Sequence, residues 1–183
     1  MGVPFDTLMF RSGTRTDAEV DESPLPDETP LAYVERVARA KAAYGVHLIG
    51  VRRLIPHLVL SADTTLEFSG RIIGKPSDAA DAQRILSELS GQTHRVLTAV
   101  AVGALDGRIE AVVQSSEVRF KTLTEEEIRR YVATGEPLDK AGAYGIQGHA
   151  GRFVEYLSGS YTGVMGLPLF ETAQLLERLG FKF

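Results

Sequence analysis

Short turns between alternating apolar segments constrain this fold more than any other feature of the sequence. Residues 94–102 and 109–121 are predicted to be strands, and the Asp106-Gly107 pair between them is typical of a tight hairpin turn. Ser69-Gly70 turns the predicted strand at residues 58–68 back on itself in the same way. Because strands joined by a hairpin run antiparallel, these turns argue against a doubly wound parallel sheet.

Four amphipathic segments with recognisable ends are expected to form helices around that sheet. The first has Thr29 as its N-cap and Pro30 in its first turn, and it is expected to end near Gly45. The third has the clearest start signal, because Thr124 and Glu127 can form a capping box. The second and fourth helices are predicted over residues 77–91 and 167–180.

A last pair of strands completes the expected order of elements. Residues 152–157 and 161–165 are predicted to pair across Ser158-Gly159-Ser160. A helix followed by two strands then occurs three times before a final helix. We predict an α/β fold with a mixed, largely antiparallel sheet flanked by helices. No internal repeat or soft linker interrupts the chain, so residues 1–183 are expected to form a single domain, with residues 1–28 as an irregular N-terminal segment.

The composition excludes several classes of protein. The chain has 183 residues, of which 44% are apolar, so it is long enough to bury a full core. A formal net charge of −4 argues against a nucleic-acid binder, whose phosphate contacts need a basic face. The absence of cysteine excludes disulfides and thiolate metal sites. No apolar run could span a membrane and no secretion signal is visible, so we expect a cytoplasmic protein without a membrane partner.

The sequence does not match several common nucleotide-binding, catalytic and metal-binding motifs. Residues 70–76 resemble a phosphate-binding loop, but the segment is one residue short and has Pro76 where a serine or threonine must hold magnesium. No G-x-G-x-x-G segment follows a strand, and no G-x-S-x-G segment is present. The four histidines show no metal-ligand spacing. A nucleotide site, if present, must therefore be of another kind.

Lys41 stands where an apolar residue is expected. At about 100° per residue it falls inside the apolar stripe of the first helix, between Val34 and Val37. A charge aimed inward is costly unless an anion meets it. The alternative is that the stem of Lys41 is buried while its ammonium reaches water.

Two other charged residues are placed in a similar way. Asp63 is a carboxylate in the otherwise apolar strand at residues 58–66, and Lys75 lies at the mouth of the second helix. Asp63 could instead cap the turn after its strand, and Lys75 could be a solvated residue beside a helix. Taken with Lys41, they favour a site for phosphates that includes a metal or a general base.

A glycine-rich stretch supplies the second informative feature. Residues 138–148 contain three glycines, which permit close approach of the backbone to a ligand. Gln147 carries both a donor and an acceptor, which suit it to contact the edge of a base. The stretch could be a plain long loop, but loops of this length in compact domains are usually functional.

Five segments of the sequence occur together in a familiar order. They are Tyr33-Val-Glu-Arg-Val-Ala-Arg-Ala-Lys-Ala42, Ser61-Ala-Asp-Thr64, Gly74-Lys-Pro76, Leu89-Ser-Gly-Gln-Thr-His94 and Leu138-Asp-Lys-Ala-Gly-Ala-Tyr-Gly-Ile-Gln-Gly148. From about residue 20 to its C-terminus the chain resembles the Maf family of nucleoside triphosphate pyrophosphatases. The resemblance implies two lobes around a cleft and often a homodimer. It also implies cleavage between the α and β phosphates, dependent on Mg²⁺ or Mn²⁺, to give a monophosphate and pyrophosphate.

The resemblance also assigns roles to individual residues. Asp63 matches the proton acceptor of the family, and Glu22 together with Asp63 matches the carboxylates on the metal side. Lys41 and Lys75 match the lysines that bind the triphosphate. The residues in these segments are similar to those of the subgroup that acts on dTTP and UTP, rather than to those of the subgroup that prefers 7-methyl-GTP. The positions associated with substrate choice are Thr64 and Gln147.

One family feature has no counterpart in this sequence. Members open with a strand and a Ser-x-Ser-Pro-Arg-Arg loop whose arginines grip the phosphates, whereas Arg11, Ser12 and Arg15 stand in a different context here. We therefore interpret the sequence as lacking that segment. The first hypothesis is a pyrophosphatase that hydrolyses dTTP, UTP and modified pyrimidine triphosphates. The alternative is a catalytically weak, shortened member that binds nucleotide or a protein in cell-division control.

Overall fold

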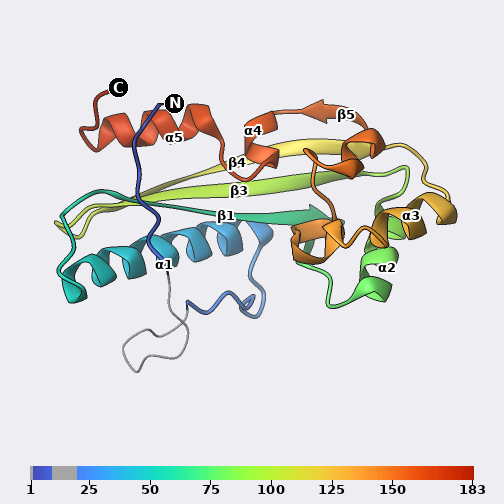
Figure 1. The fold of residues 1–183 in the computed structure, drawn as a ribbon, viewed down its shortest axis with the longest axis horizontal. Coiled ribbons are helices and arrows are strands. Elements are labelled where there is room, and N and C mark those ends of the chain that lie inside the picture. The colour runs from blue at the N-terminus through green and yellow to red at the C-terminus, as the bar shows by residue number, and fades with distance from the viewer. Residues whose placement is uncertain (1, 10–19) are drawn as a thin grey trace.

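The computed structural model of the chain describes residues 2–9 and 20–183 (Figure 1). Arg11, Ser12 and Arg15 lie outside the described residues. The helices are α1 (Pro30–Val51), α2 (Ala79–Leu89), α3 (Glu125–Val132), α4 (Tyr161–Val164) and α5 (Leu169–Arg178), with short 3₁₀ helices η1 (Glu136–Asp139), η2 (Ala141–Ala143) and η3 (His149–Phe153). The strands are β1 (Val59–Phe68), β2 (Arg71–Ile73), β3 (Thr93–Gly103), β4 (Ile109–Phe120) and β5 (Val154–Ser158).

The strands form one five-stranded sheet in the order β2-β1-β3-β4-β5, and each neighbouring pair is antiparallel. The predicted α/β class and the largely antiparallel sheet are confirmed. The hairpins at Ser69-Gly70 and Asp106-Gly107 are confirmed as well, because each connects two adjacent strands. Pairing of β1 with β3 places Thr64 opposite Thr98.

Helices cover both faces of the sheet (Figure 1). Because side chains alternate along a strand, β3 presents Leu97, Ala99 and Ala101 to α1 on one face. On the other face its Val100 and Val102 pack with residues of α5. A separate core lies at one end of the sheet beneath α2, α3 and the 3₁₀ helices. None of the helices in the described ranges is both long and apolar enough to cross a membrane.

The capping signals in the sequence correspond to real caps. The Thr124 hydroxyl accepts a hydrogen bond from the Glu127 amide at 3.2 Å, and the Glu127 carboxylate accepts one from the Thr124 amide at 2.9 Å. Thr29 caps α1 by accepting a hydrogen bond from the Ala32 amide. These caps satisfy amide groups that have no partner within the helix, so they set where each helix begins.

One expected helix end and one expected strand are wrong. Helix α1 continues past Gly45 to Val51, because Gly45 serves close packing rather than termination: a Cβ there would lie 2.6 Å from a methyl group of Val59. Residues 161–165 do not form a strand. The Ser160 hydroxyl accepts a hydrogen bond from the Gly163 amide at 3.0 Å and thereby starts the short helix α4.

His94 gives the end core a pH-dependent stability. Its ring is 2% exposed and packs edge-on against Phe120 and Tyr144, whose hydroxyl lies 2.8 Å from Nε2. Burial lowers the pKa of His94 from 6.5 to about 4. Between these values the unfolded chain binds more protons than the folded one, so stability rises with pH. We expect the free energy of unfolding to be lower by roughly 3 kcal/mol, because of His94, once the pH falls below about 4.

Urea unfolding at pH 7 and pH 4 measures this effect. His94→Gln should show a smaller loss of unfolding free energy over that interval than the unaltered chain. His57→Gln, at an exposed position, should behave like the unaltered chain. Equal losses in His94→Gln and His57→Gln would contradict the assignment.

Candidate active site

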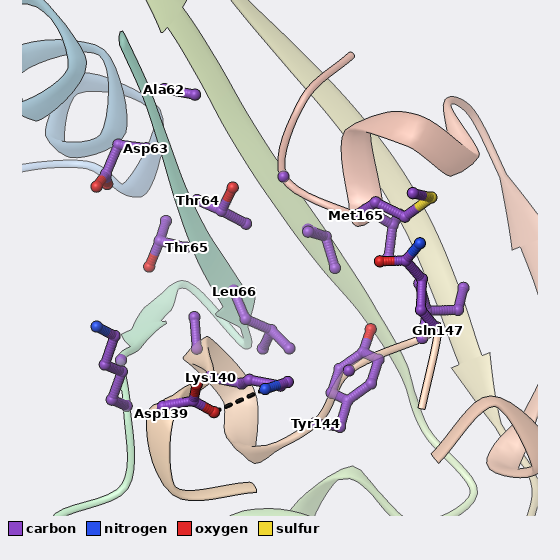
Figure 2. A pocket seen from close by; sticks show the side chains of 18 of the residues that line it. Ala62, Asp63, Thr64, Thr65, Leu66, Asp139, Lys140, Tyr144, Gln147 and Met165 are labelled. Carbon is purple, nitrogen blue, oxygen red and sulfur yellow. Dashed lines mark hydrogen bonds and ion pairs between the residues drawn. The ribbon is translucent and has the colours of Figure 1, made fainter. Parts of the chain in front are cut away.

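A cavity of about 580 Å³ opens where the end core meets the main body of the sheet. Its walls come from α1, β1, the β2–α2 connection, the segment at residues 139–148 and the α4–α5 connection. Figure 2 shows part of this lining. The structure brings together around this one cavity all the site residues expected from the sequence: Glu22, Lys41, Asp63, Thr64, Lys75 and Gln147.

Lys41 is held between two carboxylates. Its Nζ donates to Asp63 Oδ1 at 2.7 Å and lies 2.9 Å from Glu22 Oε1. The Lys41 side chain is 19% exposed and that of Asp63 only 11%. The inward orientation expected for Lys41 is therefore confirmed, and its ammonium is met by anions rather than extended into solvent.

Burial and charge act against each other at this pair. Burial raises the pKa of Asp63, and Glu22 adds to the increase, while the hydrogen bond from Lys41 and the charge of Lys75 oppose it; the net pKa is raised. Burial by itself would lower the pKa of Lys41, but its bonds to Asp63 and Glu22 raise it overall. A cation therefore persists beside a carboxylate of raised basicity, and such a carboxylate is a better proton acceptor.

Glu22 comes from a segment without helix or strand, and α1 holds that segment in place. Arg36 donates to the carbonyl oxygen of Asp21 at 3.3 Å and to that of Ser23 at 2.9 Å. The Tyr33 hydroxyl donates to the Glu22 carbonyl oxygen at 2.9 Å. The backbone is thus bound at Glu22 and on both sides of it, so its carboxylate is kept beside Lys41.

Lys75 lies in the β2–α2 connection, on the same side of the cavity. Its side chain is exposed, and it makes no ion pair with any residue in the part of the chain that the structure describes. Its charge nevertheless acts on Asp63, whose pKa it lowers in opposition to burial. Lys75 is therefore fully available to an anionic ligand, whereas two of the three ammonium protons of Lys41 already face carboxylates.

The carboxylate of Glu136 holds the glycine-rich segment in place through hydrogen bonds. Glu136 accepts hydrogen bonds from the Tyr131 hydroxyl at 2.9 Å and from the His149 amide at 3.0 Å. A Cβ at Gly148 would overlap this carboxylate, so any other residue at this position would have to displace the carboxylate from its hydrogen bonds. These hydrogen bonds hold the exposed Gln147 at the rim of the cavity.

The cavity has a charged half and a neutral half. Asp63 and Thr64 are consecutive on β1 and point to opposite sides of the strand (Figure 2). Asp63 faces Lys41, whereas Thr64 lies on the side of Gln147 and Met165 (Figure 2). Phosphates would therefore suit the side of Asp63, and an uncharged group the side of Thr64.

Sequence reasoning missed several residues that line the cavity or hold its lining in place. Tyr33 and Arg36 were given no role, because only the folded chain shows the segment at residues 21–23 lying against α1. Lys140 also lines the cavity and donates to Asp139 Oδ1 at 2.7 Å (Figure 2). The single available signal was that Lys140 lies within the glycine-rich stretch.

The donor set at Lys41 fits a hard divalent cation. Two carboxylates, Asp63 and Glu22, converge on a single point, which Lys41 Nζ occupies. Over residues 2–9 and 20–183, no cluster of three or more His, Asp or Glu side chains is arranged to hold a metal ion. Mg²⁺ is commonly bound by one or two carboxylates together with substrate phosphates, and Asp63 and Glu22 supply two carboxylates.

Proteins of known family are similar to this chain over most of its length. The family model described as Maf-like protein matches residues 6–179. A dTTP/UTP pyrophosphatase of Dechloromonas aromatica is 63% identical over 182 residues, which cover 100% of this chain and 90% of that protein. A dTTP/UTP pyrophosphatase of Aromatoleum aromaticum is 60% identical over 183 residues, with 99% and 88% covered. One of Cupriavidus metallidurans is 49% identical over 183 residues, with 100% and 90% covered.

Proposed function

Because the chain belongs to the Maf family, we propose that it is a nucleoside triphosphate pyrophosphatase that hydrolyses dTTP and UTP. The products are the nucleoside monophosphate and pyrophosphate. The observation that carries the proposal is the partly buried Asp63, of raised pKa, joined to Lys41 in a cavity with a neutral half beside it. The names of the similar proteins from Dechloromonas and Aromatoleum support the substrates.

The residues of the cavity divide the chemistry among them. Asp63 accepts the proton of the attacking water, and its raised pKa suits that task. Lys41 and Lys75 provide the positive charge that holds the triphosphate and stabilises negative charge as the phosphoanhydride bond breaks. Pyrophosphate leaves, and the proton remains on Asp63 until solvent takes it.

Asp63 and Glu22 would hold a divalent cation, Mg²⁺ or Mn²⁺. When bound, such an ion neutralises charge on the phosphate oxygens. The two carboxylates already converge on the ammonium of Lys41, which supports a binding place for a cation here. Chelation with EDTA should stop pyrophosphate release, and added Mg²⁺ should restore it.

Arg36 is expected to matter for metal binding although it lies outside the cavity lining. Arg36→Met removes the bonds to the Asp21 and Ser23 carbonyl oxygens and the ion pair with Glu28, so only the Tyr33 hydroxyl still holds the backbone at Glu22. We expect the Mg²⁺ concentration that gives half-maximal activity to rise by about tenfold. A matched control is Arg84→Met, which removes only exposed ion pairs on α2. An unchanged Mg²⁺ requirement in Arg36→Met would mean that Glu22 does not hold the ion.

Pyrophosphate release from a panel of nucleotides tests the proposed function. The purified chain is supplied with dTTP, UTP, CTP, GTP or 7-methyl-GTP and with Mg²⁺ or Mn²⁺. We expect release from dTTP and UTP and little from 7-methyl-GTP. A folded chain that releases none from any nucleotide would instead support a protein that binds nucleotide without turnover.

Quaternary structure and location in the cell stay predictions. We expect a homodimer in the cytoplasm, with no nucleic acid or membrane as partner. Light scattering on the purified chain measures the mass of the assembly. A mass near 19.9 kDa, that of one chain, would contradict the dimer.

A further inference from the structure

A buried hydroxyl lies directly behind Thr64. Thr98 on β3 is 0% exposed, and its Oγ1 lies 2.8 Å from the carbonyl oxygen of Gly163 and 2.9 Å from Oγ1 of Thr64. A carbonyl oxygen can only accept, and a hydroxyl has one proton to donate. The proton of Thr98 therefore goes to Gly163, and Thr64 must donate its own proton to Thr98.

The consequence concerns what Thr64 can offer a ligand. With its proton directed backwards to Thr98, the Thr64 hydroxyl has only lone pairs left for the cavity that it lines. Gly166 lies beside this oxygen without a side chain, and a Cβ there would come into ordinary van der Waals contact with Thr64 Oγ1 at 3.6 Å. Gly166 also has a φ of +106°, which disfavours any other residue. Thr64 therefore presents an open hydrogen-bond acceptor.

Because the Thr64 oxygen can only accept a hydrogen bond, it favours contact with a donor group of the substrate. Phosphate oxygens are acceptors themselves, so they gain nothing from Thr64. Lys41 binds Asp63, which points to the other side of β1, while Gln147 and Met165 lie on the side of Thr64 (Figure 2). The group that meets Thr64 must be a donor on an uncharged part of the nucleotide.

We propose that Thr98 is a positioning residue that fixes Thr64 as the acceptor for the N3–H group of uracil or thymine. This inference rests on the proposed function and explains its base preference. Uracil and thymine carry one donor on their pairing edge, N3–H, between two carbonyl groups. Cytosine carries an unprotonated N3 at this position, so two acceptors, cytosine N3 and Thr64 Oγ1, would face each other. Binding would remove both from water and give neither a hydrogen bond, which is costly.

Binding of nucleotides that cannot be cleaved tests the inference without turnover. The probes for calorimetry are the α,β-imido analogues of dUTP and dCTP and an α,β-imido dUTP methylated at N3. We expect the dUTP analogue to bind at least about tenfold more tightly than the other two, the equivalent of one hydrogen bond. Equal binding of the methylated and unmethylated uracil nucleotides would overturn the inference.

Variants of Thr98 separate a positioning role from a structural one. Thr98→Val keeps the shape but frees the Thr64 proton to turn toward the ligand, so preference for uracil over cytosine should fall by about tenfold. Thr98→Ser retains the hydroxyl and should retain the preference. A folded Thr98→Val chain with unchanged preference would overturn the inference. If Thr98→Val does not fold, the N3-methyl comparison on the unaltered chain decides.

Failure of this inference can be told from failure of the proposed function. A chain that loses its preference for uracil in Thr98→Val but releases no pyrophosphate contradicts the proposed function and supports the role of Thr98. A chain that hydrolyses dTTP and UTP but binds the N3-methylated analogue equally well supports the function and overturns the role of Thr98.

Discussion

Asp63→Asn should lower the turnover of dTTP and UTP by at least about 10² while leaving the fold intact. An asparagine has the size of an aspartate and can still accept a hydrogen bond from Lys41, but it cannot take a proton from water. Lys41 also keeps its contact with Glu22. The measurement is pyrophosphate release at saturating nucleotide, with thermal unfolding as the check on folding.

The matched control for that variant is Asp106→Asn. Asp106 lies at the exposed turn between β3 and β4, where its carboxylate binds Arg108. Turnover in this control should equal that of the unaltered chain. Near-normal turnover in Asp63→Asn would remove Asp63 from the mechanism and leave the base to another group.

Lys41→Met should both weaken the enzyme and change its pH profile. Loss of the cation that meets the phosphates is expected to lower kcat/KM by about 10². The second effect follows from Asp63: activity is lost as the pH falls through the pKa of this base, and Lys41 holds that pKa down. Removal of Lys41 therefore raises the pKa of Asp63 further, and activity should begin to fall at a higher pH.

The direction of the shift makes this prediction specific. Lys182→Met removes an exposed lysine near the C-terminus and should alter neither kcat/KM nor the pH profile. In Lys41→Met, an acid limb that stayed in place or moved to lower pH would show that Asp63 is not the group that titrates. Rates measured across pH 4 to 8 at low substrate concentration report on the free enzyme.

Most of the fold could be predicted because its signals are local. A capping box needs only Thr124 and Glu127, and a hairpin turn such as Asp106-Gly107 acts on the strands beside it. The errors arose where a local signal had two meanings. Glycine is common at the C-terminal end of a helix, but Gly45 lies inside α1, where it allows close contact with Val59. The turn residues before Ser160 are typical of a hairpin, but they lead into a helix instead of a strand.

For the site, the helical period was enough to place Lys41 inward, because that argument involves α1 alone. The apolar strand around Asp63 also indicated this residue, and the resemblance to a family added its role as proton acceptor and the expected substrate class. None of these signals could have found Thr98, because its role depends on the register that pairs β1 with β3 and on the position of Gly163 in α4.

Periodicity, caps and turns thus determined most of the elements, most of their order and the inward charge, since each acts over a few neighbouring residues. The tertiary structure decided which distant groups meet. Glu22 reaches Lys41 because Arg36 binds the backbone beside it, and the proton of Thr64 points away from the cavity because Thr98 is packed behind it. Contacts of this kind depend on packing between segments far apart in the chain, which no local pattern encodes.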